Sequence, residues 1–178
     1  MPFEGPRRRD FNEPGHAHEL TFSTFRRVPL FAEPMVCRAF LRHLDRAQTR
    51  HEFDVWAYVL MPDHVHLLVW PRSPSYRMAE IRNAVKQPFA REVLSRMEAE
   101  QDPILSRLQI GTRRRFWQAG GGYDRNIVSR NACLSSIEYI HRNPVAAGLA
   151  EQPSEFPWSS AASHQGLPFE FHLDSIKW

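Results

Sequence analysis

Residues 58–71 read YVLMPDHVHLLVWP, an apolar run interrupted by two histidines that are one residue apart. Successive side chains of a β-strand point to opposite faces, so His64 and His66 share one face, and the apolar residues around them share the other. Pro62-Asp63 has the residue types of a turn and divides the run into two strands. The stretch therefore predicts a β-hairpin that presents two imidazoles side by side.

The remaining elements follow from hydrophobic periodicity and from turn residues. Their predicted order is βαββαβα, which indicates an α+β fold: a ferredoxin-like two-layer sandwich, with a mostly antiparallel sheet and helices on one face. The predicted strands are 18–27, 53–61 and 64–70, the helices are 35–50, 78–100 with a kink or break at Pro88, and 131–143, and strand and loop fill 107–128.

Length and composition indicate one domain with short extensions. In a chain of 178 residues we expect a flexible N-terminal arm over 1–14, the main domain over 15–150 and a C-terminal extension over 151–178. No run has the length of a membrane span or the pattern of a signal peptide, so a cytoplasmic protein without a membrane partner is expected. Cys37 and Cys133 lie outside any CxxC motif and are interpreted as core thiols.

Arginine dominates the basic residues, since the chain has 23 lysines and arginines and only Lys86 and Lys177 are lysines. The planar guanidinium suits phosphate and base edges. One cluster, Arg113–Arg115, leads directly into Phe116-Trp117, a combination typical of nucleic-acid binding. The alternative is a set of solvated charges in an arginine-rich proteome.

The two histidines of the hairpin have two interpretations, satisfied core residues or a pair of metal ligands. A second His-x-His, His16-Ala17-His18, precedes the first predicted strand, and spacing alone does not separate the two motifs. Two imidazoles do not complete a metal site, so a third ligand and a reacting group are needed.

The last predicted helix offers both groups. At 100° per residue, Leu134, Ile137 and Ile140 form the expected buried stripe, and Tyr139 lies on the opposite side. Asn143 follows Tyr139 by one turn on the same polar face, which also includes Ser136. A nucleophilic phenol, an amide oxygen and two imidazoles would make a metal-assisted phosphoryl-transfer centre. A surface tyrosine and a helix-ending asparagine are the alternative.

The ordered set of motifs resembles the HUH endonucleases, and within them the single-tyrosine branch of REP-associated tyrosine transposases. The resemblance runs from about Pro14 to Ser160 and rests on VLMPDHVHLLV, Phe116-Trp117-Gln118, Tyr123-Asp124, Tyr139-Ile140, Asn143-Pro144, Ala147-Gly148-Leu149 and FPWSS. It implies that His64, His66 and Asn143 bind a divalent metal, Mg²⁺ or Mn²⁺, and that Tyr139 attacks DNA. The simpler insertion-sequence transposases carry Gln where this chain has Asn143.

By the same resemblance, the expected activity is cleavage and joining of single-stranded, hairpin-containing DNA of the REP type through a 5′-phosphotyrosine, and a monomer is favoured over a homodimer. The sequence identifies no general base. Two other functions stay open: a DNA-binding protein of this fold without turnover, and a metal-dependent nuclease in which Tyr139 is structural. Basic residues at element ends or beside the proposed site are the predicted DNA contacts: Arg26, Arg27, Lys86, Arg113, Arg114 and Arg115.

Overall fold

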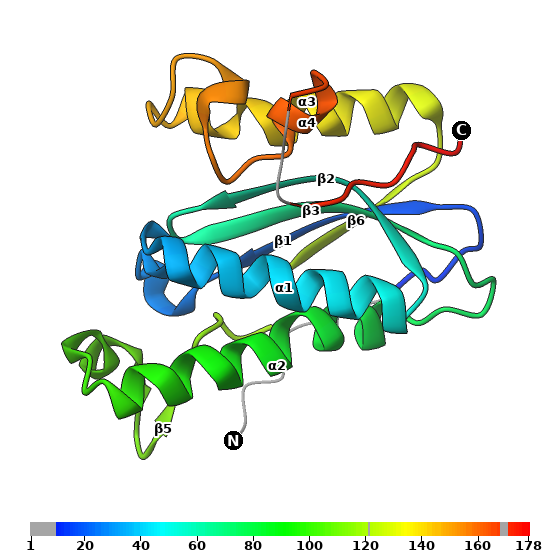
Figure 1. Cartoon of the computed structure of the whole chain (residues 1–178). Helices are drawn as coiled ribbons and strands as arrows, with labels where there is room; N and C mark the ends of the chain where they lie inside the picture. The colour runs from blue at the N-terminus through cyan, green and yellow to red at the C-terminus, as the bar shows by residue number, and fades with distance from the viewer. Residues whose placement is uncertain (1–9, 121, 168–170) are drawn as a thin grey trace.

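The computed structural model describes residues 10–120, 122–167 and 171–178 (Figure 1). Short 3₁₀ turns join several of the longer elements. In chain order the strands and α-helices are β1 (Ala17–Ser23), α1 (Pro34–Arg50), β2 (Phe53–Met61), β3 (His64–Pro71), α2 (Met78–Ala99), β4 (Gln109–Ile110), β5 (Arg113–Arg114), β6 (Tyr123–Ile127), α3 (Arg130–Ala146) and α4 (Ala161–His164).

The central sheet has four strands in the order β2-β3-β1-β6, and every neighbouring pair is antiparallel. If the four strands are numbered one to four along the chain, the sheet read from β6 to β2 has the order 4-1-3-2, which is that of a ferredoxin-like fold. The β2–β3 hairpin turns at Pro62-Asp63, as the sequence predicts. The predicted fold class is thereby confirmed.

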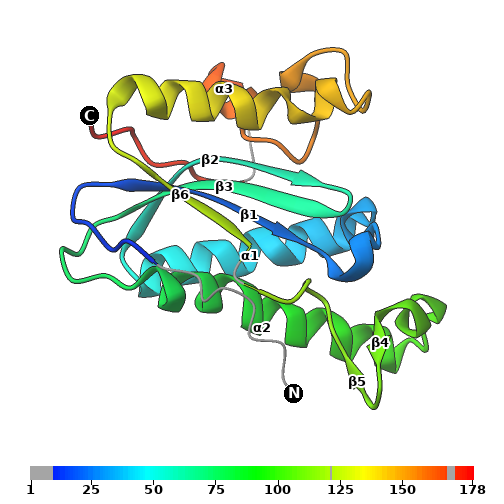
Figure 2. The ribbon, with the colours of Figure 1, turned by 180° about the vertical axis from the view of Figure 1, so that it is seen from behind.

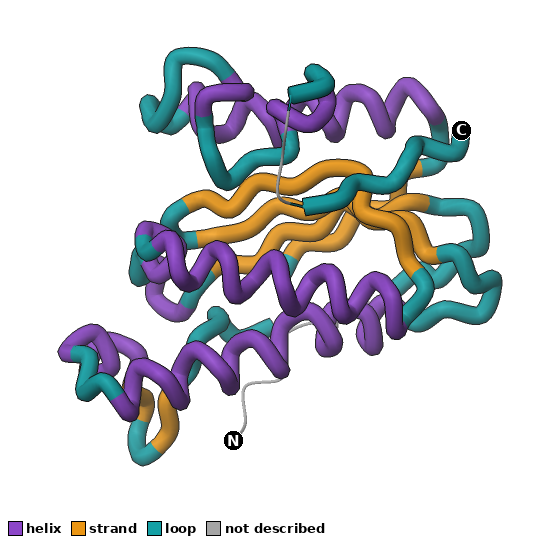
Figure 3. The backbone as a smooth tube through the Cα atoms, in the orientation of Figure 1, coloured by secondary structure: helices purple, strands orange, loops and turns teal. Residues whose placement is uncertain are grey.

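Helices cover both faces of this sheet (Figures 1 and 3). α1 and α2 lie on one face, where Val65, Leu67 and Val69 of β3 enter the larger core. α3 lies on the other face, over a second core that includes Trp56 and Leu68. The expectation of helices on one face thus holds for α1 and α2, and α3 adds a third layer because the hairpin is apolar on both sides.

Three element boundaries differ from the predictions. β1 ends at Ser23 rather than at 27, because the Thr24 hydroxyl donates to the carbonyl of Val28 and the chain turns into a 3₁₀ segment. α2 continues through Pro88, and α3 continues through Pro144 to Ala146. Proline removes one backbone donor from a helix. In both helices, packing of the buried side chains against the sheet layer outweighs that loss.

Both ends of the described chain are attached to the domain. Residues 1–9 of the predicted arm lie outside the described residues, whereas the side chain of Asn12 accepts a hydrogen bond from the backbone N–H of Met78. At the C-terminal end, the N–H of Asp174 donates to the carbonyl of Val55 at the edge of β2. None of the helices in the described part of the chain is long and apolar enough to cross a membrane.

Candidate active site

The two hairpin histidines lie on the α3 face of β3. Their ring centroids are 4.9 Å apart. Nδ1 of His64 lies 2.6 Å from a carboxylate oxygen of Asp63, and Nδ1 of His66 lies 2.9 Å from the hydroxyl of Thr21 on β1. Each ring is therefore oriented through Nδ1, which leaves Nε2 as the candidate ligand atom.

His66 is held in its neutral form. Burial, the nearby His64 and the positive charge of Arg27 lower its pKa to about 4, against a smaller opposing effect of the Asn143 side chain, which hydrogen-bonds to it. At neutral pH the imidazole therefore keeps a lone pair free, which is the state that a metal ligand requires.

Helix α3 brings a tyrosine to these histidines. The hydroxyl of Ser129 accepts a hydrogen bond from the N–H of Ala132 and caps the helix. Almost three turns later, the ring of Tyr139 lies edge-on to His66 with 5.6 Å between centroids. Tyr139 is 54% exposed, so its hydroxyl is open to a large substrate.

Asn143 lies on the next turn of α3. Its Nδ2 donates to the backbone carbonyl of Tyr139 over 2.8 Å, and its side chain also reaches His66. The structure thus brings together the four residues that the sequence selects, namely His64, His66, Tyr139 and Asn143.

The buried side of α3 differs in phase from the prediction. Leu134 is 47% exposed, and the residues that pack on the sheet are Cys133, Ile137 and Ile140. Ser136, which was expected on the polar face beside Tyr139, is buried. The prediction was wrong at these two positions. Hydrophobicity alone does not reveal that a polar group on the sheet hydrogen-bonds to Ser136 and so turns this side of the helix inward.

That polar group is Glu19, which the sequence analysis missed. Its carboxylate is buried on β1 and accepts hydrogen bonds from the Ser136 hydroxyl at 2.6 Å and from the Arg125 guanidinium at 2.8 Å. Arg125 also donates to the Ser136 hydroxyl at 2.9 Å. We call these three residues the α3 clip, since they join the helix to β1 and β6 three residues before Tyr139. The signal in the sequence was a carboxylate on the same face of the predicted strand as Thr21, since Glu19 is the one acidic residue of β1.

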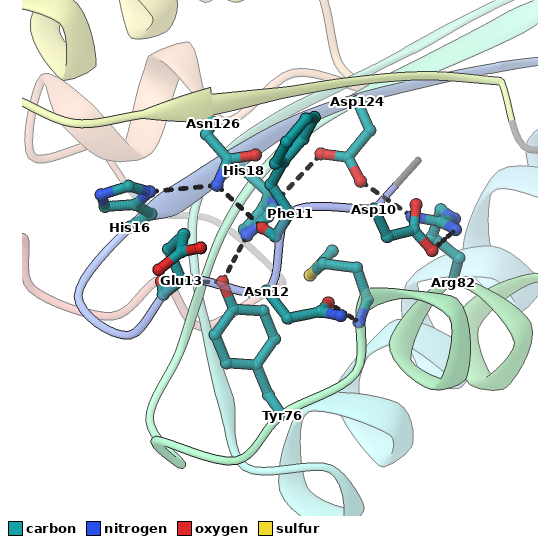
Figure 4. A network of polar contacts seen from close by, with 11 residues as sticks. Asp10, Phe11, Asn12, Glu13, His16, His18, Tyr76, Arg82, Asp124 and Asn126 are labelled. Atoms are coloured by element: carbon teal, nitrogen blue, oxygen red, sulfur yellow. Dashed lines mark hydrogen bonds and ion pairs between the residues drawn. The ribbon is translucent and has the colours of Figure 1, made fainter. Parts of the chain in front are cut away.

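The second His-x-His motif lies elsewhere. His18 points to the opposite face of β1, where its ring contacts Asp124 at 2.7 Å and the Tyr76 hydroxyl at 2.8 Å (Figure 4). His16 lies against the amide of Asn126. The two rings are thus engaged in a polar network that includes Arg82, and the structure separates them from the His64–His66 pair.

The predicted DNA-contacting residues fall into two groups. Arg27 lies beside the histidines, with Nε 3.5 Å from Asp63, and Arg26 precedes it in the same 3₁₀ turn. Lys86 is largely buried, with Nζ 5.5 Å from the centre of the Trp117 ring. Arg114 and Arg115 line the same cavity as Lys86, of about 380 Å³.

Arg113 is exposed on β5 and does not line that cavity. Of the six predicted residues, Arg27 is the one that the structure places at the histidines.

The donors at this site fit a divalent cation with open coordination positions. Among the described residues, no cluster of three histidine, cysteine or carboxylate side chains could hold a metal. A third protein ligand would therefore be the amide of Asn143, which the interaction with His66 places within reach. Two imidazoles and an amide oxygen leave room for substrate oxygens, as catalytic rather than structural metal sites do.

The structure therefore defines a ferredoxin-like protein with paired histidines on the sheet and a tyrosine on the helix that covers them. A family model described as "Transposase IS200 like" matches residues 15–143. The protein belongs to this family of transposases. It is therefore assigned to the enzymes that cut and transpose DNA.

Two solved structures are similar to this chain. One, of a REP-associated tyrosine transposase bound to a REP hairpin, is 18% identical, has a TM-score of 0.68, and the similarity covers 98% of this chain and 95% of the other. Another, from Deinococcus radiodurans R1 and described as a candidate transposase, is 18% identical with a TM-score of 0.49 over 76% of this chain and 96% of the other. No protein with a curated description matches significantly. The resemblance drawn from the sequence motifs is confirmed.

Proposed function

We propose that this protein cleaves and rejoins single-stranded DNA beside a hairpin, with Tyr139 as the nucleophile and a 5′-phosphotyrosine as the intermediate. The observation that carries the proposal is the packing of a half-exposed tyrosine ring against His66, whose own ring lies 4.9 Å from that of His64. No other tyrosine in the described chain contacts this histidine pair.

Tyr139 fits the role of nucleophile because a helix supports it. Ile137 and Ile140 on either side of it are buried against the sheet, so the helix cannot roll without exposing them. The Asn143 side chain donates to the carbonyl of Tyr139 and further fixes this turn. A reactive group must be held within about 0.5 Å of its productive position.

His64, His66 and Asn143 would hold a divalent metal, Mg²⁺ or Mn²⁺. When bound there, such an ion supplies Lewis-acid polarisation of the phosphate oxygens. Asp63 and Thr21 orient the two imidazoles through Nδ1. The low pKa of His66 keeps its lone pair available at neutral pH.

The chemistry is a transesterification that conserves the number of phosphate ester bonds. The phenolic oxygen of Tyr139 forms a bond to phosphorus, the bond from phosphorus to the 3′ oxygen breaks, and the leaving oxygen takes a proton while the phenol loses one. A phenol is protonated near neutral pH, so the site must accept that proton. Attack by a second 3′-hydroxyl on the phosphotyrosine reverses the step and joins two strands without a nucleotide cofactor.

Single-stranded DNA is the proposed substrate because the half-exposed ring of Tyr139 lies near basic residues. Arg27 lies at the histidines, Arg26 precedes it in the same 3₁₀ turn, and the cavity lined by Lys86, Arg114 and Arg115 offers a further phosphate-binding surface. Arg113 would add a peripheral contact from β5. The similar solved structure contains a REP hairpin, which supports a hairpin next to the single strand. All the catalytic groups come from one chain, so a monomer suffices.

Covalent trapping tests the proposal. Labelled single-stranded DNA that carries a REP-type hairpin and the single strand next to it is supplied with Mg²⁺ or Mn²⁺, and the product is separated by denaturing electrophoresis. We expect an SDS-resistant adduct with the wild-type protein, none with Tyr139→Phe, and an adduct with Tyr123→Phe. DNA binding by Tyr139→Phe should persist, because removal of one hydroxyl leaves the phosphate contacts that dominate affinity.

The same assay separates the two alternatives. Binding without cleavage by the wild-type protein would indicate a DNA-binding protein without turnover. Cleavage without an adduct, unchanged in Tyr139→Phe, would indicate a nuclease in which this tyrosine is structural. For the metal, a His64→Ala/His66→Ala protein should lose saturable Mn²⁺ binding measured by electron paramagnetic resonance, and retention of that binding would refute the ligand assignment.

A further inference from the structure

A second exposed tyrosine shares the face of the sheet with the candidate active site. Tyr123 on β6 pairs with Thr21 of β1, and Thr21 pairs on its other side with His66 of β3. Residues directly opposite each other in a sheet project from the same face. The hydroxyl of Thr21 contacts His66, which confirms the face. Tyr123 thus projects toward the α3 side, two strand spacings, or roughly 10 Å, from His66.

The ring of Tyr123 is open to solvent at this position. It is 53% exposed, whereas Ile127, which shares its face of β6, is buried beneath α3. Figure 2 shows β6 beside β1 on the way to the start of α3. The helix therefore covers one end of β6 and leaves the other end uncovered, where the tyrosine lies.

This tyrosine has no evident structural role. Tyr58 packs edge-on against Phe171, and Tyr76 hydrogen-bonds to His18 and to a backbone carbonyl. Within the described part of the chain, the Tyr123 side chain makes neither a ring contact nor a hydrogen bond that would explain an aromatic residue there. A large ring left half-exposed on a rigid strand is available to a ligand.

The backbone fixes where this ring lies. Gly122 has a φ of +72°, and a Cβ at that position would lie 2.1 Å from the carbonyl oxygen of Thr21. The chain can therefore enter β6 this close to β1 only through a glycine. Tyr123, the next residue, begins a strand that is paired along β1, so it is placed more rigidly than a loop residue would be.

The charges around the ring suit a polynucleotide. Arg125 projects from the same face two residues further along β6, with its side chain 49% exposed, although one of its nitrogens is engaged by Glu19. Arg27 lies on the far side, near His66. An aromatic face between cations is the arrangement with which proteins bind single-stranded nucleic acid, since every base can stack and every phosphate is negative.

We propose that Tyr123 is a nucleobase-stacking platform that holds one base of the single strand near the phosphate attacked by Tyr139. The inference rests on the proposed function and adds a binding role to a residue that takes no part in the chemistry. The ring, and not the hydroxyl, carries the role. Phe at position 123 therefore preserves it, and Leu removes it.

An abasic scan tests the proposal on protein that binds DNA but does not cut it. The Tyr139→Phe protein is titrated by fluorescence anisotropy with the REP-type hairpin oligonucleotide of the trapping assay, in which each single-stranded base near the hairpin is replaced in turn by an abasic site. We expect affinity to fall about tenfold at one position, the size of one base–aromatic contact. Adding Tyr123→Leu should weaken binding of the intact DNA about tenfold and remove the sensitivity at that position, and adding Tyr123→Phe should change neither.

Phe11→Leu in the same background is the matched control, because Phe11 is 53% exposed and belongs to the network on the opposite face of the sheet (Figure 4). It should leave both the affinity and the abasic profile unchanged. Identical profiles for the proteins with and without Tyr123→Leu would overturn the stacking role even if the wild-type protein forms its covalent adduct. Absence of both the adduct and DNA binding would overturn the proposed function, and this inference with it.

Discussion

Removal of the Ser136 hydroxyl tests whether the α3 clip holds the helix that carries Tyr139. The hydroxyl is buried and donates to the Glu19 carboxylate over 2.6 Å. A hydrogen bond to a charged group contributes about 1.5–3 kcal/mol to the free energy of unfolding. Glu19 keeps its contact with Arg125 in a Ser136→Ala protein, so its carboxylate is not left unpaired, and the lower half of this range applies.

Alanine also has a higher helix propensity than serine, which offsets roughly 0.5 kcal/mol of the loss. Ser135→Ala controls for this gain, because Ser135 is the preceding residue of the same helix and is exposed. In urea denaturation analysed by linear extrapolation, we expect Ser136→Ala to be less stable than Ser135→Ala by about 1.5–2 kcal/mol. Two variants of equal stability, within about 0.5 kcal/mol, would refute the clip as an energetic link, since that is the usual range for uninvolved surface positions.

Three further outcomes are expected. Gly122→Ala should lower the thermal midpoint of unfolding more than Gly120→Ala does. Both residues have a positive φ, but only at Gly122 would a Cβ meet a β1 carbonyl oxygen, at 2.1 Å. Equal losses would contradict this close approach. Burial raises the pKa of Cys37 to about 12, so its thiol should resist Ellman's reagent at pH 8 in native protein and react only on unfolding. The pKa values of His66 and His141 are lowered to about 4, chiefly by burial. The unfolded state therefore binds more protons between about pH 6.5 and 4, and the free energy of unfolding should fall by up to ~1.4 kcal/mol per pH unit for each histidine as the pH drops through that window; a urea midpoint that is constant over this range would exclude the effect.

The sequence is most informative where the physical signal is local. Strand alternation around His64 and His66 predicts their shared face without any knowledge of the rest of the chain, and the structure has them there. Helical spacing likewise places Asn143 one turn after Tyr139. In both segments the apolar pattern and the candidate residues lie within a few positions of each other. The pattern therefore assigns each of the four candidate residues to a face of its strand or helix.

The α3 clip could not be predicted in this way. Glu19 and Ser136 are 117 residues apart in the chain, and nothing in the spacing of either segment indicates the other. Within its own segment, Glu19 is a carboxylate of a strand and Ser136 is a polar residue of a helix, and neither pattern predicts burial. The position of α3 on the second face of the sheet could not be predicted either. Trp56 and Leu68 make this face apolar, so a helix must bury it. Periodicity does not indicate which helix does so.

The layered arrangement separates the two halves of the proposed chemistry. The histidines are fixed by strand pairing and by Asp63 and Thr21 within the sheet, whereas Tyr139 is positioned by the packing of α3 on that sheet and by the clip. A change that shifts α3 should therefore displace the nucleophile while the two imidazoles stay in place. The two imidazoles and the nucleophile therefore depend on different parts of the fold, whereas Asn143, the proposed third ligand, lies on the helix of the nucleophile. Damage to the clip should lower the rate of adduct formation more than it weakens Mn²⁺ binding, because two of the three proposed ligands stay on the sheet and only Asn143 moves with α3. An equal loss of both would mean that the sheet and α3 do not behave as separate supports.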